Sequence, residues 1–424
     1  MTTYNTHTLP NGLRIIHRPS DADVVYCGYA IGAGSRHEAP GDEGLAHFCE
    51  HVSFKGTRRR SALQILTCLE RVGGDLNAFT NKEDTVYHAA IQSRHIRRAV
   101  DLLSDIVFHS VYPEEETRRE VEVICDEIES YNDSPAELIY DRFDNLVFSG
   151  HPLGHPILGS ADRVRTYTSD DARRFTRRHY RPDNAVFFAY GKLDFGRLVK
   201  WLEASELSEN SEKSENSENS ENSENSENPE NSENSENSEN SESPAPSAPL
   251  SPPHQAHVML GTRAYSHNDE RRTALYLLNN ILGGPGMNAR LNLSLRERNG
   301  LVYTVESSMA SYSDAGVWTT YFGCDHADVN RCLRLVRREL DRVMQRPLSD
   351  RQLEAAKRQL KGQIAIAADN REQSVLDLAR GFLHYGTTND TAALCERIDA
   401  LTPQQLQDVA QETFEPAQLM HLVI

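Results

Sequence analysis

Apolar and polar residues follow two different periods along the first half of this chain. Four segments repeat apolar residues every three or four positions, which is the pattern of an amphipathic helix. They are residues 62–72, 95–108, 113–131 and 170–179. Five shorter segments are rich in apolar or alternating residues and are bounded by turn residues, which predicts strands. They are residues 14–17, 24–32, 75–80, 84–91 and 184–191.

The organisation of the first half recurs in the second half. Residues 95–127 form a predicted helix, a turn that contains proline and a charged helix, and residues 329–362 repeat this plan with Pro347 at the turn. Residues 180–187 end the first half in a strand, and residues 414–424 end the second half in the same way. The sequence therefore predicts two homologous α+β domains.

The composition changes abruptly between the two halves. A glutamate recurs at every third position from Glu203 to Glu242, and Lys213 is the single basic residue in that tract. Residues 204–253 consist of Ser-Glu-Asn triplets followed by Ser-Pro-Ala-Pro repeats, with almost no apolar side chain to offset the entropy of ordering. We expect a disordered linker here, with domains at residues 1–203 and 254–424.

The overall charge and the cysteines restrict the classes of partner and location. The formal net charge is −18, but most of it lies in the glutamate tract and the remaining chain is only mildly acidic. The sequence shows no cluster of basic residues suited to the phosphates of nucleic acid. Its first residues lack the apolar core expected of a signal peptide, and no apolar run reaches the ~20 residues that span a bilayer. Seven scattered cysteines without a Cys-x-x-Cys pair indicate reduced thiols. We expect a cytoplasmic protein with neither nucleic-acid nor membrane partners.

Residues 44–52 carry the strongest candidate chemistry. In a helix, His47 and His51 lie one turn apart and about 40° from each other around the axis. Glu50 lies roughly 60° from His47 on the neighbouring flank. Two imidazoles with a carboxylate between them suit one zinc ion and one water molecule. The alternative is a pair of surface histidines that happen to be four residues apart.

A third metal ligand must come from elsewhere, because a catalytic zinc normally takes three protein ligands. In a helix over residues 113–131, Glu127 falls about 20° from Glu120, on a face that also carries Ile124. Most other acidic residues of this segment fall on the opposite, outer face. An ionised carboxylate on an apolar face needs a cation or hydrogen-bond donors. Glu120 and Glu127 are therefore the candidates.

These motifs resemble the pitrilysin/insulinase family of zinc peptidases, which includes mitochondrial processing peptidase. The sequence His47-Phe48-Cys49-Glu50-His51, followed by Glu127, is similar to the family's inverted zinc signature, and residues 54–57 and 74–80 extend the match. The resemblance implies that His47, His51 and Glu127 bind one zinc ion per chain. It implies that Glu50 is the general base and that Glu120 is a further carboxylate near the metal.

The resemblance also reaches two substrate-binding segments. Residues 295–303 are similar to the family's Arg/Tyr pair, which implies that Tyr303 donates to the developing oxyanion and Arg296 holds a substrate carbonyl. The alternative is a structural arginine and a half-buried strand tyrosine. Asn77, Ala78 and Phe79 resemble an exposed edge strand to which an extended substrate adds. The alternative for this segment is the end of an internal strand.

The resemblance implies a zinc metalloendopeptidase that acts on peptides or unfolded segments. Each domain is expected to be a mixed or antiparallel sheet with helices on one face, and the two domains face each other as a clamshell. A homodimer is expected. The alternatives are a non-catalytic scaffold, disfavoured by the retained zinc signature, and a subunit that depends on a different chain, disfavoured by the presence of both Arg296 and Tyr303.

Overall fold

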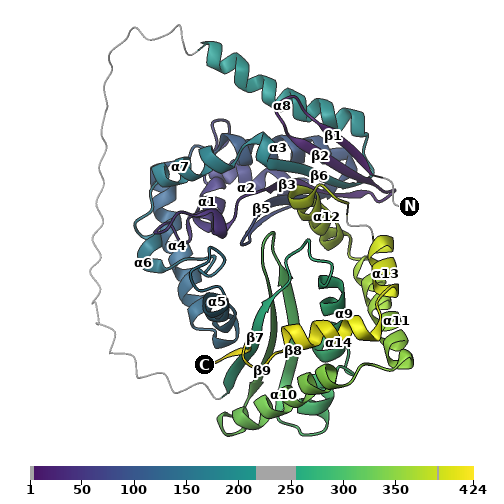
Figure 1. Ribbon diagram of the computed structural model, residues 1–424. Coiled ribbons are helices and arrows are strands. Elements are labelled where there is room, and N and C mark those ends of the chain that lie inside the picture. Colours follow the sequence, from purple (N-terminus) through teal and green to yellow (C-terminus); the bar gives the residue numbers. More distant parts are fainter. Residues whose placement is uncertain (1–3, 216–254, 389–390) are drawn as a thin grey trace, which may run out of the picture.

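The computed structural model describes residues 4–215, 255–388 and 391–424. Two β-sheets, each with its own set of helices, face each other across the molecule (Figure 1). This arrangement confirms the expected fold class of two homologous α+β domains. None of the described helices is both long and apolar enough to cross a bilayer.

The first sheet has six strands in the order β1-β2-β6-β3-β5-β4. Their bounds are β1 (Asn5–Thr8), β2 (Arg14–Pro19), β3 (Val24–Ile31), β4 (Asp75–Thr80), β5 (Thr85–Gln92) and β6 (Ala185–Gly191). Strands β2 and β6 are parallel and the other neighbours are antiparallel, so the sheet is mixed. The predicted strands all form, and β4 lies at one edge.

Helices of the first half cover one face of this sheet and bury its main core. Their bounds are α1 (Leu45–Ser53), α2 (Ala62–Glu70), α3 (Ile96–His109), α4 (Glu114–Asn132), α6 (Ala161–Val164) and α7 (Ser169–His179). The four predicted helices agree with α2, α3, α4 and α7 to within two residues. Because their apolar stripes repeat every three to four residues, one side of each helix enters the core.

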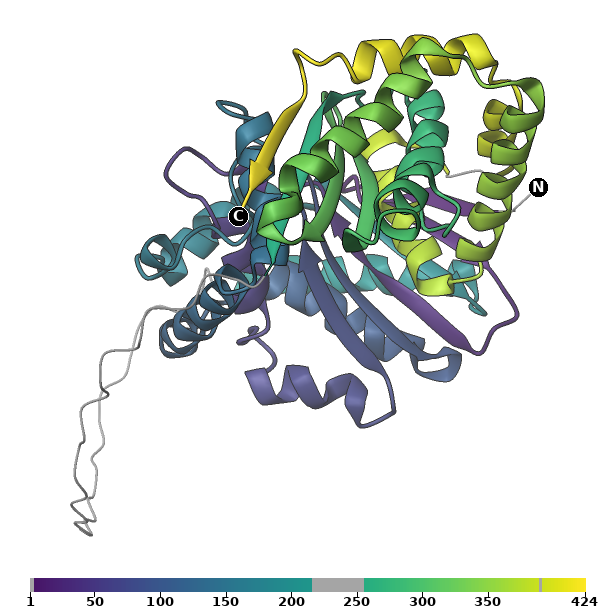
Figure 2. The same cartoon turned by 90° about the horizontal axis from the view of Figure 1, so that it is seen from below.

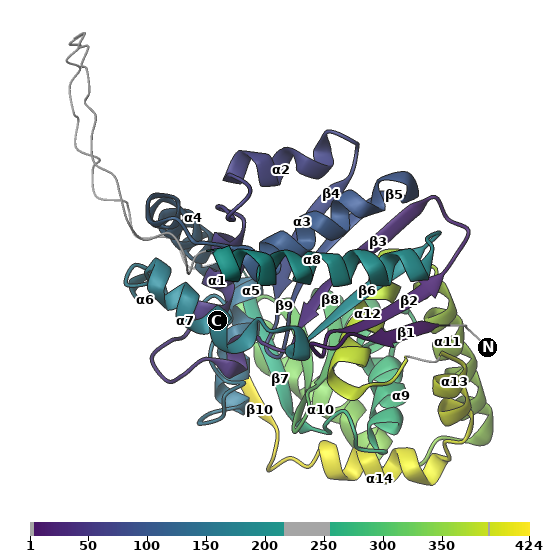
Figure 3. The same cartoon turned by 90° about the horizontal axis from the view of Figure 1, so that it is seen from above.

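The helix α8 (Phe195–Glu215) changes the prediction for the start of the linker. It packs beside α3 (Figure 3), with Leu198 and Leu202 completely buried, and continues to Glu215. Residues 204–215 are therefore helical and not disordered, because a helix nucleated by its packed first turns extends readily through glutamates. The rest of the predicted linker, residues 216–253, lies outside the described residues.

The second sheet has four antiparallel strands in the order β10-β7-β9-β8. The C-terminal strand β10, yellow in Figure 2, lies at one edge. They are β7 (Ala256–Ala264), β8 (Val302–Ser311), β9 (Gly316–Cys324) and β10 (Met420–Val423). The accompanying helices are α9 (Arg272–Gly283), α10 (Val329–Gln345), α11 (Asp350–Ala367), α13 (Thr391–Asp399) and α14 (Pro403–Thr413). The pair α10 and α11 matches the predicted repeat of α3 and α4.

Each half also sends one helix to the other half's sheet. The helix α12 (Arg371–Tyr385) packs on β3 and β6, where Val375 and Ala379 contact a cluster that includes Phe188. The helix α5 (Pro135–Val147) packs on β7 and β10, where Phe143 and Met259 belong to one buried cluster. The two halves are therefore interleaved, since the second face of each sheet is covered by a helix from the opposite half (Figure 1).

Candidate metal centre

The start of α1 is fixed by a buried carboxylate and a glycine. Gly44 precedes the helix with φ of 91°, a conformation that only glycine adopts readily. The carboxylate of Glu38 accepts hydrogen bonds from the backbone N–H groups of Gly44 (3.1 Å) and Ala46 (2.7 Å). It also accepts one from Nε2 of His155 at 2.9 Å. Because the first turn of α1 is held in this way, the position of its histidines is defined.

The two faces of α1 separate packing from chemistry. Phe48, Cys49 and Val52 are completely buried and face the core between α1, α4 and α7. His47 and His51 project from the other side, as the one-turn spacing predicts. Their rings are 4.5 Å apart between centroids.

Three donor atoms from α1 and α4 converge at this place. Nε2 of His51 lies 3.2 Å from Nε2 of His47 and 3.3 Å from Oε2 of Glu127. Nε2 of His47 lies 3.8 Å from the same Oε2 of Glu127. One ligand atom from each residue lies within 4.8 Å of the others. Two imidazole nitrogens and one carboxylate oxygen in this cluster fit the three-ligand set of a catalytic zinc.

The protonation of the two imidazoles differs because their surroundings differ. Burial, followed by the charge of His51, lowers the pKa of His47 to about 4. Burial alone would also lower the pKa of His51, but hydrogen bonds to Glu120 and Glu127 raise it to about 9. Nδ1 of His47 has no hydrogen-bond partner among the described residues. A neutral His47 is the form that a metal ion requires.

Glu120 lies on the other side of His51 from Glu127. Its Oε1 accepts a hydrogen bond from Nδ1 of His51 at 3.0 Å, and its Oε2 lies 2.5 Å from Nζ of Lys55. Burial would raise the pKa of Glu120, but its hydrogen bonds to His51 and Lys55 hold that pKa below the usual value. The contact with Nδ1 leaves Nε2 of His51 to face the cluster.

Glu50 is buried beside the cluster but is not one of its three donors. Its Oε2 accepts a hydrogen bond from the hydroxyl of Thr80 at 2.7 Å. Burial raises the pKa of Glu50 above the usual value for a glutamate. Thr80 is the last residue of β4, so this bond connects the edge strand to α1.

The predicted edge strand lies at the edge of the first sheet. Asn77, Ala78 and Phe79 belong to β4, which pairs with β5 on one side and with no other strand among the described residues. The three residues are half-buried or exposed. On β4 itself, the N–H groups of Leu76 and Ala78 donate to the side-chain oxygens of Asp75 (3.0 Å) and Asn77 (2.8 Å), contacts that an added strand would replace.

Arg296 and Tyr303 lie together but away from the cluster. The Arg296 guanidinium is 5.7 Å from the centre of the Tyr303 ring, and Tyr303 is 80% exposed. Both line a cavity of about 1320 Å³ that is formed mostly by the second half, with Tyr4 and Arg18 from the first half. The lining of this cavity and the histidine cluster therefore have no described residue in common.

Three supporting residues were given no role by the sequence. Glu38 accepts a hydrogen bond from the first turn of α1, Lys55 forms an ion pair with Glu120, and Thr80 donates to Glu50. Lys55 and Thr80 fall within residues 54–57 and 74–80, so the family resemblance was the feature of the sequence that pointed to them. Glu38 carries no local signal, since it lies six residues before Gly44 and outside any regular capping motif.

Comparisons with known proteins agree with this geometry. The profile described as insulinase (peptidase family M16) matches residues 14–161, and the one described as peptidase M16 inactive domain matches residues 166–360. A Streptomyces coelicolor protein named as an uncharacterized zinc protease is 32% identical, covering 97% of this chain and 87% of its own length. YmxG of Bacillus subtilis, named likewise, is 30% identical over 96% of this chain and 95% of its own.

Two solved structures show the same fold. A protease from Helicobacter pylori superposes with a TM-score of 0.84 at 20% identity, over 100% of this chain and 99% of that one. A structure from Pseudomonas fluorescens, titled peptidase M16 inactive domain, has a TM-score of 0.82 at 17% identity, covering 99% and 97%. Because both halves match and close relatives span nearly the whole chain, this protein belongs to the insulinase family, peptidase family M16.

Proposed function

We propose that this protein is a zinc-dependent endopeptidase that hydrolyses peptide bonds in peptides or unfolded segments. The observation that carries the proposal is the convergence of donor atoms from His47, His51 and Glu127 beside the buried carboxylate of Glu50. One zinc ion per chain would polarise a water molecule and lower its pKa towards neutrality. Residues 1–203 supply these groups, and residues 254–424 form the opposing, substrate-binding half.

Two glutamates beside the zinc ligands have separate roles in this proposal, one in proton transfer and one in orienting a ligand. Glu50 takes a proton from the attacking water and returns it to the leaving amine. Its Oε2 is held by Thr80, so Oε1 is the oxygen left for this transfer. Glu120 fixes the orientation of His51 through Nδ1, which is the usual role of a carboxylate behind a metal-bound imidazole.

The substrate is recognised mainly through its backbone. An extended segment adds to the open edge of β4 at Asn77, Ala78 and Phe79, and main-chain pairing favours chains that are short or unfolded. A segment paired with β4 would bring its scissile bond close to Glu50, because Thr80, the last residue of that strand, donates to Glu50. All seven cysteines are free thiols, which supports the expected cytoplasmic location.

The active form is a homodimer in this proposal. Arg296 and Tyr303 line a cavity separate from the metal cluster of their own chain. Tyr303 donates to the oxyanion and Arg296 holds a substrate carbonyl, either after the halves close or from the second copy. This separation is also the observation that favours a partner-dependent subunit as the second candidate.

The test measures zinc content and the cleavage of a quenched fluorescent peptide. Glu50→Gln is expected to keep its zinc and to lose about 10²–10⁴-fold in turnover, the usual contribution of a general base. Glu127→Gln is expected to lose zinc as well. Glu122→Gln is the matched control, because Glu122 is exposed on the outer face of the same helix. Equal activity of the wild type and Glu50→Gln, or activity that survives complete chelation, would contradict the proposal.

A further inference from the structure

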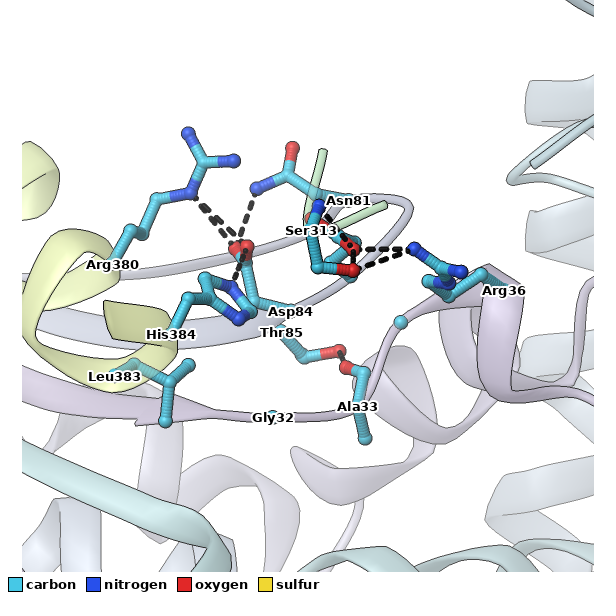
Figure 4. Close-up of polar contacts among 12 residues, drawn as sticks. Gly32, Ala33, Arg36, Asn81, Asp84, Thr85, Ser313, Arg380, Leu383 and His384 are labelled. Carbon is cyan, nitrogen blue, oxygen red and sulfur yellow. Dashed lines mark hydrogen bonds and ion pairs between the residues drawn. The ribbon is translucent and has the colours of Figure 1, made fainter. Parts of the chain in front are cut away.

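Side chains of the second half of the chain form hydrogen bonds with the turn between β4 and β5. Asp84, at the end of this turn, is completely buried. Nε of Arg380 lies 3.1 Å from both of its carboxylate oxygens, and Nε2 of His384 donates to Oδ2 at 2.9 Å (Figure 4). Arg380 and His384 lie one turn apart on α12. Nδ2 of Asn81 donates a further hydrogen bond to Oδ1 of Asp84 at 2.8 Å.

The neighbouring carboxylate is held by a different element of the second half. Glu83 accepts hydrogen bonds from the backbone N–H of Ser313 at 3.1 Å and from its hydroxyl at 2.6 Å. Ser313 lies in the turn between β8 and β9, so the edge hairpins of the two sheets meet at their tips. Arg36 joins the contact, with Nη1 2.5 Å from Oε1 of Glu83. The same Nη1 donates to the hydroxyl of Ser313 at 3.0 Å (Figure 4).

The other end of the turn is attached to Glu50. The turn is tight, since the N–H of Asn81 donates to the carbonyl of Asp84 at 2.8 Å. Thr80 precedes it, pairs with Thr85 in the hairpin register and donates its hydroxyl to Glu50. The hydroxyl of Thr85 in turn donates to the carbonyl of Ala33 at 2.8 Å.

The two attachments depend on each other for an energetic reason. A buried carboxylate such as Asp84 is costly without its cationic and hydrogen-bonding partners. If α12 withdrew, the turn would have to shift to hydrate Asp84. Because the hairpin is closed by its own hydrogen bonds, Thr80 would shift with it.

We propose that the second half positions Glu50 through this turn. Thr80 is a positioning residue that holds one oxygen of Glu50 and aims the other at the reacting water. Arg380 and His384, with Ser313, hold the turn where Thr80 can reach Glu50. The inference rests on the proposed role of Glu50, and it gives the second half a part in the chemistry that does not require contact with substrate.

The first test replaces the hydroxyl of Thr80. Thr80→Val is expected to lower kcat about 10–100-fold while KM changes less than about twofold and the zinc content is unchanged, since a group acting only in the transition state affects kcat. Thr80→Ser keeps a hydroxyl and is expected to restore most of the activity. Wild-type kcat in Thr80→Val, or an equal loss in Thr80→Ser, overturns the proposal. Turnover by the wild type but not by Glu50→Gln in the same assay shows that the proposed function stands independently.

The second test asks whether α12 acts through Thr80. Arg380→Gln is expected to lower kcat about 3–10-fold alone and to have no further effect in the Thr80→Val background, as coupled residues behave in a double-mutant cycle. His384→Gln is the second variant if Arg380→Gln folds poorly. Arg371→Gln is the matched control, because Arg371 is exposed on the same helix. Losses that multiply in the double variant overturn the proposal.

Hydrogen exchange provides a readout that does not need turnover. Amides of residues 75–92 are expected to exchange faster in Arg380→Gln than in the wild type or Arg371→Gln, because the turn is no longer held. If the wild type cleaves no peptide, the proposed function fails. Faster amide exchange in Arg380→Gln would still show that α12 holds the turn between β4 and β5. Unchanged amide exchange in both Arg380→Gln and His384→Gln overturns the proposal that α12 holds the turn.

Discussion

Nδ1 of His51 lies 3.0 Å from Oε1 of Glu120, on the side of the imidazole opposite to the metal cluster. A carboxylate in this position accepts the proton of Nδ1 and holds the ring in one orientation, so that Nε2 faces His47 and Glu127. Lys55 stabilises the carboxylate from its other oxygen at 2.5 Å. The geometry therefore separates the residue that orients a ligand from the residues that bind the metal.

Glu120→Gln is expected to weaken zinc binding about 10–100-fold, the usual cost of losing a partner behind a metal-bound histidine. The amide removes the negative charge that both His51 and Lys55 contact. Competition with a chelator of known affinity measures the change, and Glu122→Gln on the exposed face of α4 controls for the loss of a helix charge. Wild-type affinity in Glu120→Gln would show that His51 is oriented by other contacts.

Gly44→Ala is expected to destabilise the start of α1 more than an ordinary glycine substitution. Gly44 has φ of 91°, and a Cβ there would lie 2.6 Å from the carbonyl oxygen of Leu158. Gly73→Ala is the matched control, because Gly73 has φ of 71° but nothing lies within 4 Å of its Cβ position. The control carries only backbone strain, on the order of 1 kcal/mol. A lower thermal midpoint and lower zinc content are expected for Gly44→Ala, and equal midpoints for the two variants would contradict the clash.

The parts of the site that the sequence predicts are those with a local pattern. His47, Glu50 and His51 follow from spacing within one helix, and Glu127 follows from its phase on another helix together with the family resemblance. Thr80 and the partners of Asp84 could not be predicted in this way. Asp84 and His384 are 300 residues apart in sequence, and no periodicity relates them.

The same limit applies to the fold. The repeated plan of the two halves predicts α10 and α11 from α3 and α4, because each segment has its own amphipathic period. It does not predict that α5 and α12 exchange sheets, since an apolar stripe indicates that a helix face is buried but not which sheet buries it. The register and the tertiary partner are properties of the whole core.

Acid is expected to weaken the packing of α12 on the first sheet. Burial alone would raise the pKa of Asp84, but the hydrogen bond from His384 and the charge of Arg380 hold it below its usual value of about 3.9. A carboxyl group with a lowered pKa stabilises the folded state above the unfolded pKa, and that contribution is lost as the pH falls through the folded pKa. Stability is therefore expected to fall below about pH 4.

The thermal midpoint measured from pH 6 to pH 3 tests this expectation. Asp84→Asn is expected to be less stable at pH 6 and to lose less on acidification, because the group that titrates is absent. Asp162→Asn serves as the control, since the side chain of Asp162 is fully exposed. An acid response of Asp84→Asn that equals the wild type would assign the pH dependence to other carboxylates.

The source of the Arg296–Tyr303 pair can be decided by mixing two inactive variants. Tyr303→Phe removes the proposed oxyanion donor, and Glu50→Gln removes the proposed base. If the pair acts from the second copy of a homodimer, a mixed dimer joins the intact Glu50 of one chain to the intact Tyr303 of the other. Random exchange of subunits would then restore about a quarter of the wild-type sites.

If each chain instead uses its own pair after closure, no mixed dimer holds a complete site and the mixture stays inactive. Glu50→Gln mixed with Glu127→Gln is the matched control, because both losses fall in the metal cluster and neither arrangement restores a site. Recovery in the first mixture but not in the control is expected, since Arg296 and Tyr303 line a cavity apart from the cluster of their own chain. A monomer by light scattering, with full activity in the wild type, would exclude the second copy and leave closure of the two halves as the way in which Tyr303 reaches the substrate.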